Sequence, residues 1–429
     1  MDKKNLPVGK IQTFGIILLS LSAIFLLFQT PLFTGVFGRE NTKKDSLAQS
    51  VSSADQSYFT PFALPLKMAF CNGSAHCAYN ALTTDSTAFK NVSATLAEAI
   101  ASVQNEQEIS QDVFLDALSQ SSVYLDFMSD LPTGMVTDLL GITADFFPDT
   151  VRRMILVPSG SESVALLAQS GERFVHYATN AQGETILQEL SAISDNGFEF
   201  AGFLGKEYAH LSPFTLLGET APITTQLSAN NVLPDEEDIL RLCAMNPHTE
   251  SRYTDSSGTR VVREGDVQLA IQPDGTVVYS ENVHDGSVSF VLQTAKDASS
   301  RKELVYEAEQ FAQSMLNGRI GDAALFVSSV KEQDGVISVA LDAHIGGVPI
   351  RLSSGMHAVY MEIEGQAIRS FHIAFRSYMR ADTTAVLLPA KQAAAIVKSS
   401  EHPEIEAVYI DTGSDTVNPG WIPFGGSAK

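Results

Sequence analysis

RKELVYEAEQFAQSML (Arg301–Leu316) is the stretch that decides the fold, because a run of strand-like segments follows it directly. Leu304, Ala308, Phe311 and Met315 recur at helical spacing and predict one apolar helix face. The segments LFVSSVKE, VISVALDAHIGGVPIR, HAVYMEIEG and AIRSFHIAFRSY follow, separated by tight turns such as Gln333-Asp334-Gly335 and Glu364-Gly365-Gln366. One face of an antiparallel sheet needs an apolar cover, so we expect this helix to pack on a curved meander.

A second unit of the same kind precedes this one. A helical pattern at 236–245 is followed by the strand-like segments TRVVRE, VQLAIQP and TVVYSE, with Ser-Ser-Gly and Pro-Asp-Gly turns between them. The acidic cluster from Asp235 to Asp238 lies at the amino-terminal end of the predicted helix, where negative charge complements the helix dipole. A cation site is the alternative reading of this cluster, and we favour the dipole.

The first folded block mixes both kinds of pattern as well. Ser110 stands where a helix N-cap is expected, ahead of an amphipathic stretch. Helical spacing occurs at 92–103, 110–120 and 184–193, and strand patterns occur at 121–132, 151–158, 161–169 and 173–180. The block therefore predicts helices packed on an antiparallel sheet.

The longest charge-free run lies near the amino terminus, from Ile11 to Gly38, and includes FGIILLSLSAIFLLF. Its length of about 28 residues exceeds the roughly 20 that a membrane-spanning helix needs. A signal peptide cut after Gly38 is the alternative, but the apolar core is longer than the roughly 7 to 15 residues of such peptides. Lys3, Lys4 and Lys10 precede the run, so the positive-inside rule places the short amino terminus in the cytoplasm.

These patterns predict an α+β protein, in which an N-terminal transmembrane helix precedes an extracytoplasmic region of helix-plus-antiparallel-sheet domains. Pro213, Pro222 and Pro234 interrupt any regular pattern between the first block and the later units, which indicates a linker. We expect a cytoplasmic tail at 1–10, a transmembrane anchor at 11–38, a flexible stalk at 39–57, an N-terminal α+β domain at 58–212, a linker at 213–234, a middle helix-plus-meander unit at 235–298 and a C-terminal helix-plus-curved-sheet unit at 299–429.

The composition restricts the classes of ligand. The chain holds 28 Lys and Arg against 50 Asp and Glu, which gives a net charge of −22. Such a surface repels nucleic acid and anionic lipid head groups, so we expect neither as a ligand. The hydrophobic share of 44% is typical of a globular protein.

The three cysteines allow few roles. Cys71 and Cys77 flank a turn-forming centre in CNGSAHC and can close a small disulfide loop outside the cytoplasm. Two free thiols remain the alternative, and a zinc site with His76 lacks a fourth ligand. Cys243 lies on an apolar helical face and is expected to be a buried small hydrophobe.

Two catalytic motifs have partial matches. Asp411-Thr412-Gly413-Ser414 resembles an aspartic protease signature locally, but no second D-T-G or D-S-G supplies the carboxylate that must share its proton. Ser299 and Ser328 each precede a lysine at the S-x-x-K spacing of penicillin-recognising enzymes, and Ser194-Asp195-Asn196 matches their S-D-N. The order is wrong and K-T-G is absent, so we expect an N-cap at Ser299, a strand at Ser328 and a turn at Ser194.

No other residues form a catalytic or cofactor motif. His344, His357 and His372 fall in or beside the predicted meander without paired metal-ligand spacing, and no P-loop or dinucleotide-binding fingerprint is present. We expect Trp421, the single tryptophan, to pack in a terminal cap; a ligand-stacking ring is the alternative. The sequence predicts a binding or regulatory ectodomain with no catalytic, cofactor-binding or metal-binding residues.

Several phrases resemble the YycH/YycI regulators, and the YycH branch most closely. They are YLDFMSDLP, MNPHTESRYTDSSGTRVVREGDVQLAIQPDGTVVYSE, EAEQFAQSML and the Gly346-Gly347-Val348-Pro349-Ile350 strand, behind a short cytoplasmic end and an anchor. The resemblance spans most of the chain without invariant chemistry, and the CNGSAHC loop and the strong acidity depart from it. It implies a non-enzymatic, single-pass membrane protein of Gram-positive bacteria that associates with the cell-wall sensor histidine kinase WalK and with a paralogous regulator.

Two hypotheses follow for function. In the first, the anchor touches kinase helices through the small residues Gly15, Ser20, Ser22 and Ala23, because close backbone approach favours association in lipid. In the second, the curved sheet of an anchored ectodomain binds a small molecule or a cell-wall fragment. A deep groove with convergent polar groups would favour the second hypothesis, and a flat partner face would favour the first.

Overall fold

The computed structural model describes residues 61–73, 77–81, 87–143, 148–194, 196–219, 225–281, 301–397 and 402–424. All of them belong to the compact unit Phe59–Lys429. The predicted tail, anchor and stalk, with Gly15, Ser20, Ser22 and Ala23, lie outside the described residues. Within the described ranges, no helix has the length and apolarity to cross a membrane.

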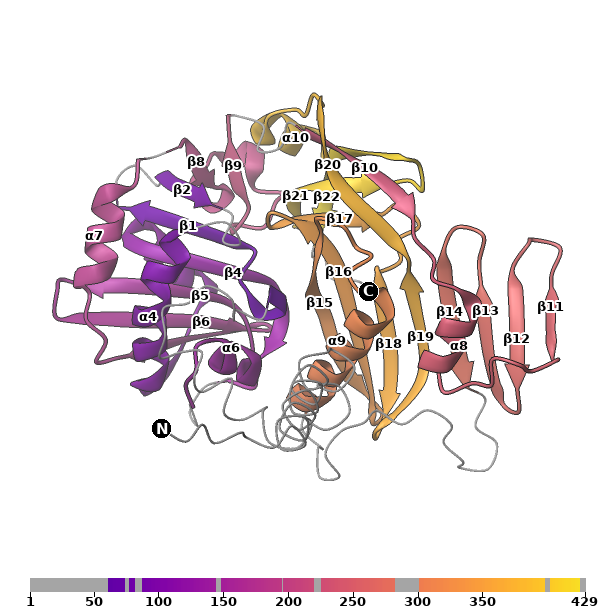
Figure 1. The fold of residues 1–429 in the computed structure, drawn as a ribbon. Coiled ribbons are helices and arrows are strands. Elements are labelled where there is room, and N and C mark those ends of the chain that lie inside the picture. Colours follow the sequence, from indigo (N-terminus) through magenta and orange to yellow (C-terminus); the bar gives the residue numbers. More distant parts are fainter. Residues whose placement is uncertain are drawn as a thin grey trace, which may run out of the picture. The chain divides into compact units, whose positions relative to one another are not determined.

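Nine described strands form the first sheet, in the order β3-β7-β6-β5-β4-β1-β2-β8-β9, and each strand pairs antiparallel with its neighbour (Figure 1). Consecutive residues are buried along most of β4 and β5, and successive side chains point to opposite faces, so both faces of the sheet are covered. The strands are β1 (Lys67–Asn72), β2 (Cys77–Ala81), β3 (Gln104–Ile109), β4 (Ser121–Pro132), β5 (Thr150–Ser159), β6 (Ser163–Ser170), β7 (Arg173–Ala178), β8 (Phe198–Phe200) and β9 (Leu216–Gly218).

Helices cover the two faces of this sheet. On one face, α4 (Thr87–Ala101) and α7 (Glu184–Ala192) pack on β6, β4 and β1 through residues such as Leu96 and Ile186. On the other face, Phe114 of α5 (Gln111–Asp116) packs against Tyr124 and Ile155. Ser110 caps α5, because its hydroxyl accepts a hydrogen bond from the Val113 N–H at 3.3 Å, as the sequence predicts.

Thirteen described strands form the second sheet, in the order β11-β12-β13-β14-β19-β18-β16-β17-β21-β22-β10-β20, with β15 paired to β16. The β17–β21 pair is parallel and the other named pairs are antiparallel. The strands are β10 (Thr225–Asn231), β11 (Arg252–Thr254), β12 (Arg260–Glu264), β13 (Val267–Ile271), β14 (Thr276–Glu281), β15 (Ala324–Gln333), β16 (Val336–Ile345), β17 (Val348–Leu352), β18 (Val359–Glu364), β19 (Ala367–Ala374), β20 (Arg376–Thr384), β21 (Glu404–Asp411) and β22 (Thr416–Phe424).

Three helices accompany the second sheet: α8 (Glu236–Leu242), α9 (Arg301–Leu316) and α10 (Ala390–Ile396). Helix α9 packs on β16 and β18, and its predicted face is confirmed by Leu304, Ala308 and Met315, which are almost fully buried. The Gly346-Gly347 turn joins β16 to β17; both glycines have positive φ angles, 59° and 84°, that suit a tight hairpin. Both predicted helix-plus-meander units are therefore present.

The second sheet differs from the sequence prediction in how far its strands extend. Strand β14 of the middle unit pairs with β19 of the C-terminal unit, so the two meanders form one continuous sheet. The predicted linker at 213–234 contains β10, which pairs with β20 and β22 and buries Leu227 and Ala229. Pairing with strands far along the chain orders this polar, proline-bounded stretch. The domain limits themselves stay a prediction.

A further helix, α6 (Thr133–Leu139), directly follows β4 and links the two sheets. Lys302 Nζ of α9 lies 2.9 Å from a carboxylate oxygen of Asp138, and the Tyr306 hydroxyl donates to the same carboxylate at 3.2 Å. Strand β15 also packs on β4, and the Ser129 hydroxyl donates to the Val327 carbonyl at 2.8 Å. The described sheets therefore share one hydrophobic core.

Candidate functional site

The most densely charged buried site lies where β21 meets the first sheet. At the start of β21, the carboxylates of Glu404 and Glu406 are nearly inaccessible to solvent. Arg152 Nη2 donates to Glu404 at 2.8 Å, Arg153 donates to the same carboxylate, and Lys67 donates to Glu406. We call this group of residues, together with Asp126, the charged joint. It ties β1 and β5 to a strand more than two hundred residues away in the sequence.

Asp126 of β4 completes the charged joint from the side of the first sheet. Its carboxylate accepts hydrogen bonds from the Tyr124 hydroxyl at 2.9 Å and from Arg153 Nε at 3.0 Å. Burial opposes ionisation of this carboxyl, but the positive charges of Arg153, Arg152 and Lys67 outweigh burial and lower its pKa to about 2. Asp126 therefore stays ionised at any physiological pH.

A local distortion of β4 brings Asp126 into position. The pairing of β4 with β5 shifts register between Asp126 and Leu131, and Met128 has a φ of 63° within this segment. The Met128 N–H donates to the Asp126 carboxylate at 2.7 Å, which holds the left-handed backbone in place. A buried methionine in this conformation stores strain on the order of 1–3 kcal/mol. The charged joint and the strained residue are thus one structural unit.

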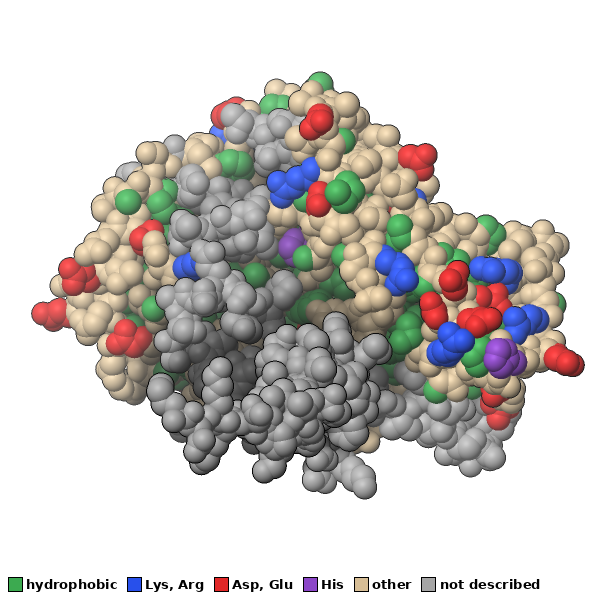
Figure 2. All heavy atoms as spheres, in the orientation of Figure 1, with side chains coloured by type: hydrophobic (Ala, Val, Ile, Leu, Met, Phe, Trp, Pro, Cys, Tyr) green, Lys and Arg blue, Asp and Glu red, His purple; other side chains and the backbone are tan. Residues whose placement is uncertain are grey.

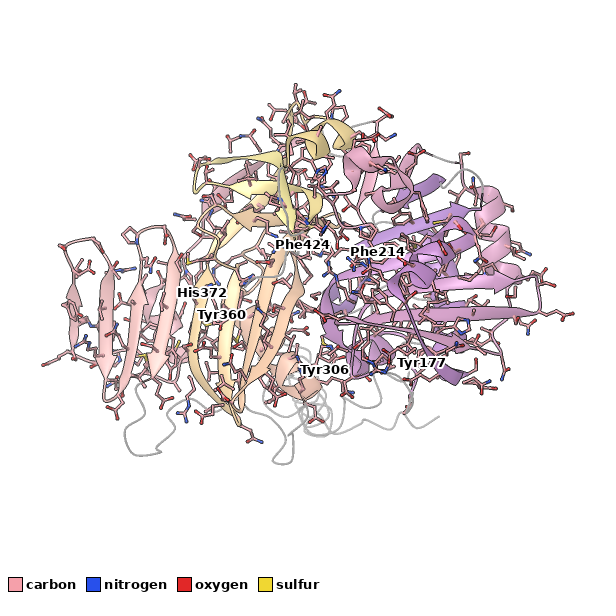
Figure 3. All side chains as sticks on the ribbon, turned by 180° about the vertical axis from the view of Figure 1, so that it is seen from behind. Tyr177, Phe214, Tyr306, Tyr360, His372 and Phe424 are labelled. Atoms are coloured by element: carbon pink, nitrogen blue, oxygen red, sulfur yellow. The ribbon has the colours of Figure 1, made fainter. Side chains whose placement is uncertain are left out.

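Aromatic rings surround the guanidinium groups of the charged joint. The Arg153 guanidinium carbon lies 4.8 Å from the centroid of the Phe214 ring, and that of Arg152 lies 5.7 Å from the Phe424 ring. Arg351 of β17 reaches the same Phe424 ring at 5.2 Å. Figure 3 labels Phe214 and Phe424 where the first sheet meets the second. The faces of these rings favour the positive charges.

A second cluster, around Asp342 of β16, contains the side-chain types of a Ser-His-Asp triad. The Ser328 hydroxyl and the Asp342 carboxylate lie 3.3 Å and 3.1 Å from the same ring nitrogen, Nδ1 of His357. In a catalytic triad, one ring nitrogen of the histidine bonds the serine hydroxyl and the other ring nitrogen bonds the aspartate. Ser328 moreover lies within hydrogen-bonding distance of the Ala340 carbonyl, and Arg351 donates to Asp342. This geometry does not activate Ser328.

Asp411 of the D-T-G-S motif is bound by one arginine and one tyrosine hydroxyl. Arg376 donates from Nε and Nη2 to its two carboxylate oxygens at 3.0 Å and 2.9 Å, and the Tyr378 hydroxyl donates at 2.8 Å. An aspartic protease requires a second carboxylate at this distance to share a proton. Asp411 therefore anchors β21 to β20, as a buried ion pair.

Removing this carboxylate has a predictable cost. Asp411→Ala leaves the nine-tenths buried guanidinium of Arg376 without its carboxylate, so we expect the free energy of unfolding to fall by about 3 kcal/mol. Urea unfolding of the full-length protein measures this change. Asp415→Ala, at an exposed position of the same turn, is the matched control and should alter stability by under about 0.5 kcal/mol. Equal effects of the two variants would contradict this role for Asp411.

Of the remaining candidate residues, His357 and His372 are neighbours, but the described residues form no further catalytic or metal-type cluster. Ser299 lies outside the described residues, Ser194 follows α7, and Ser328 lies on β15 as predicted. His372 Nε2 lies 3.1 Å from the His357 carbonyl, whereas His344 Nδ1 accepts from the Gly347 N–H on a buried turn. No described group of three or more His, Cys, Asp or Glu residues could hold a metal ion.

Cys71 and Cys243 form no reactive site, and Trp421 packs near a neighbouring helix. Cys71 and Cys243 are free and buried, and burial raises the pKa of each thiol to about 12, so neither is a reactive thiolate. The side chain of Cys77 lies outside the described residues, so the Cys71–Cys77 disulfide stays a prediction. Trp421 Nε1 donates to the Leu388 carbonyl at 2.8 Å, and its ring packs near α10. Its segment is strand β22, which pairs with β21.

The acidic start of α8 is neutralised by neighbouring arginines. Arg241 donates to Glu237 at 2.9 Å and to Asp238 at 3.1 Å, while Arg252 and Arg260 both reach Glu236. Figure 2 shows acidic and basic side chains intermingled over this part of the molecule. Glu236, Glu237 and Asp238 lie in the first turn of α8, as the sequence predicts, and their ion pairs with arginines are a contact that the sequence does not predict.

Sequence reasoning misses the charged joint, although it contains a signal. Glu404 and Glu406 alternate with apolar residues on β21, Arg152 and Arg153 interrupt an otherwise apolar β5, and Asp126 lies in an apolar β4. Buried charges need partners, so charged residues at interior strand positions predict a network. Which of them pair is set by tertiary structure.

The charges buried in the charged joint and around Asp411 bind one another and leave no acid–base pair or nucleophile assembled. The fold and the site thus define a two-sheet α+β protein whose buried ionic groups join its parts.

This fold is YycH-like. The crystal structure of YycH from Bacillus subtilis matches with a TM-score of 0.58 and 9% sequence identity, over 86% of this chain and 96% of that chain. No family model and no curated protein sequence matches the chain. The likeness therefore concerns the three-dimensional fold, which agrees with the resemblance that the sequence suggests.

Proposed function

We propose that the chain is a non-enzymatic, membrane-anchored regulator of a two-component sensor histidine kinase in cell-wall homeostasis. The observation that carries the proposal is the YycH-like fold, which extends over 96% of the YycH chain. The charge-free run from Ile11 to Gly38 supports an anchor in the cell membrane, with the bulk of the chain outside the cytoplasm. The buried ionic groups, which bind one another, support a role in binding without catalysis.

The physical requirement for such regulation is modest. A regulator that fits one kinase state better than the other shifts their populations by its difference in binding free energy, on the order of 1–3 kcal/mol. In lipid, the small residues Gly15, Ser20, Ser22 and Ala23 of the predicted anchor would let the backbones of kinase helices approach closely. The folded part would hold the anchor beside the kinase and, together with a paralogous regulator, set the orientation of the assembly.

Deleting residues 1–38 and secreting the rest is expected to abolish the effect of the protein on kinase output, because the contact in lipid is lost. Expression of a reporter gene under the kinase's response regulator measures this output. The matched control is the same ectodomain on an unrelated single-pass anchor. This control separates the effect of membrane attachment from the effect of the anchor's own sequence. Wild-type output from the secreted form would contradict a role for the anchor.

Crosslinking in native membranes, followed by identification of the crosslinked protein, tests the partner. We expect a sensor histidine kinase among the products. Capture of cell-wall fragments with no kinase would favour the alternative, a ligand-binding ectodomain.

A further inference from the structure

The second sheet has an outer face opposite helices α8 and α9. Cross-strand pairing lines up two rows of side chains there, on strands β11 to β14, β19 and β18, and we call these rows the outer face. The inner rows, such as Val262, Leu269 and Tyr279, are almost fully buried, whereas the residues of the outer face are half-buried or exposed, apart from Val261, which is 5% exposed. The apolar row is Tyr253, Val261, Ala270, Val278, His372 and Tyr360, and the polar row is Arg263, Gln268, Ser280, Ser370 and Glu362.

The outer face is nearly free of charge, in a protein with a net charge of −22. Figure 3 views this face, with Tyr360 and His372 neighbouring each other on it and no described helix in front of the strands. Arg263 and Glu362 are the two charged residues of the rows. Lys331, on β15, stands in the same polar row two strands beyond Glu362. An acidic partner can approach this face with less repulsion than elsewhere.

Both rows are self-complementary about an axis along β14. Arg263 on β12 and Glu362 on β18 lie two strands to either side of β14, about 19 Å apart in total. A twofold axis parallel to β14 therefore places Arg263 of one copy opposite Glu362 of the other, and this contact occurs twice. Lys331 falls outside this paired region.

The same axis matches large side chains with small ones. It places Tyr360 of one copy opposite Val261 of the other, and His372 opposite Ala270. Val278, on β14, meets its own counterpart at the axis. Tyr360 and His372 are stacked with ring centroids 5.6 Å apart, so they form one preformed ridge that faces the small residues. Sheets packed face to face interdigitate in this manner.

We infer that the outer face binds a second copy of this chain, as an isologous dimer with its twofold axis along β14. The charged residues are already oriented for this contact. Glu362 accepts from the Tyr360 hydroxyl at 3.0 Å and from Ser370 at 2.8 Å, and Arg263 Nε donates to Gln268 at 3.0 Å. Little side-chain ordering is then needed on association.

Charge reversal in the full-length chain, purified in detergent with two different affinity tags, tests the dimer. In the proposed dimer, position 263 of each copy faces position 362 of the other. Arg263→Glu alone therefore places two carboxylates opposite each other at both contacts, and Glu362→Arg alone places two arginines opposite each other at both contacts. We expect either variant to weaken self-association by about tenfold or more, in co-purification and sedimentation velocity. A mixture of the two variants restores both opposite-charge contacts, so it should associate within about threefold of wild type.

Matched controls carry the same charge changes on α8, away from the outer face. Glu237→Arg and Arg241→Glu are exposed and should leave self-association unchanged. Because every variant retains the predicted anchor, any contribution of that segment is constant. A wild-type chain that is monomeric throughout overturns the inference, as do single variants that associate like wild type. Failure of the mixed pair to recover association overturns the twofold arrangement.

Discussion

Replacing Arg153 with methionine is expected to lower the free energy of unfolding by about 3–5 kcal/mol, because the change leaves buried carboxylates without their main partner. The Arg153 side chain is 3% exposed and donates to both Asp126 and Glu404. Methionine fills a similar volume but carries no charge. The midpoint of urea unfolding should fall, with little change in the m value.

The control for this prediction is an exposed arginine on another strand of the same sheet. Arg173 of β7 pairs with Glu106 and Glu108 at the surface, and its side chain is 56% exposed. Arg173→Met should cost under about 1 kcal/mol, since solvent screens exposed pairs. If Arg153→Met were as mild as Arg173→Met, the charged joint would contribute no more to stability than a surface ion pair.

Neutralising the partners should recover part of the loss. A triple variant combines Arg153→Met with Asp126→Asn and Glu404→Gln. It removes both carboxylates that Arg153 binds, so no buried negative charge is left without this partner. We expect it to be more stable than Arg153→Met alone, because much of the single variant's cost comes from the charges left behind. A triple variant that is less stable than the single one would mean that the carboxylates stabilise the fold through other contacts.

The free energy of unfolding is expected to fall as the pH rises, because the carboxyl group of Glu309 ionises at lower pH in the unfolded chain than in the folded protein. Glu309→Gln should remove this part of the pH dependence. Glu309 lies on α9, is 4% exposed, and has a buried Oε1 that finds no hydrogen-bond partner among the described residues. Burial raises its pKa from 4.5 to about 8. The folded protein therefore holds a proton that the unfolded chain releases at lower pH.

The sign of the effect follows from this difference in bound protons. Below pH 4.5 both states are protonated and Glu309 costs nothing; between 4.5 and 8 the unfolded state is favoured by its ionised carboxylate. Above pH 8 the loss is complete, on the order of 4–5 kcal/mol for a shift of this size. Glu309→Gln keeps the shape but cannot ionise, so at pH 9 it should be several kcal/mol more stable than wild type.

Denaturant unfolding of wild type and Glu309→Gln at pH 5, 7 and 9 measures the difference between them, which cancels the titration of the other carboxyl groups. Glu98→Gln, on the exposed side of α4, is the control and should run parallel to wild type. A constant difference between Glu309→Gln and wild type across this range would contradict the raised pKa.

Local patterns predicted most of the secondary structure. The apolar spacing at 301–316 and Ser110 predicted α9 and the start of α5 as the structure has them. Strand β3 is missed, because Gln104–Ile109 is almost entirely polar and lies at the edge of its sheet, where no face is buried. Strand β10 is missed for a related reason: its partners β20 and β22 lie more than a hundred residues further along the chain.

The sequence by itself determined the α+β class, the helix-plus-meander units and the isolation of Asp411 from any second protease signature. These depend on side-chain periodicity and on which motifs exist, and both can be read over a few residues. Tertiary structure alone decided that the two meanders form one sheet, that Glu404 and Glu406 neutralise arginines of the first sheet, and that Arg263 and Glu362 stand symmetrically about β14. Strand pairing and buried ion pairs join residues distant in sequence, so no local pattern specifies their partners.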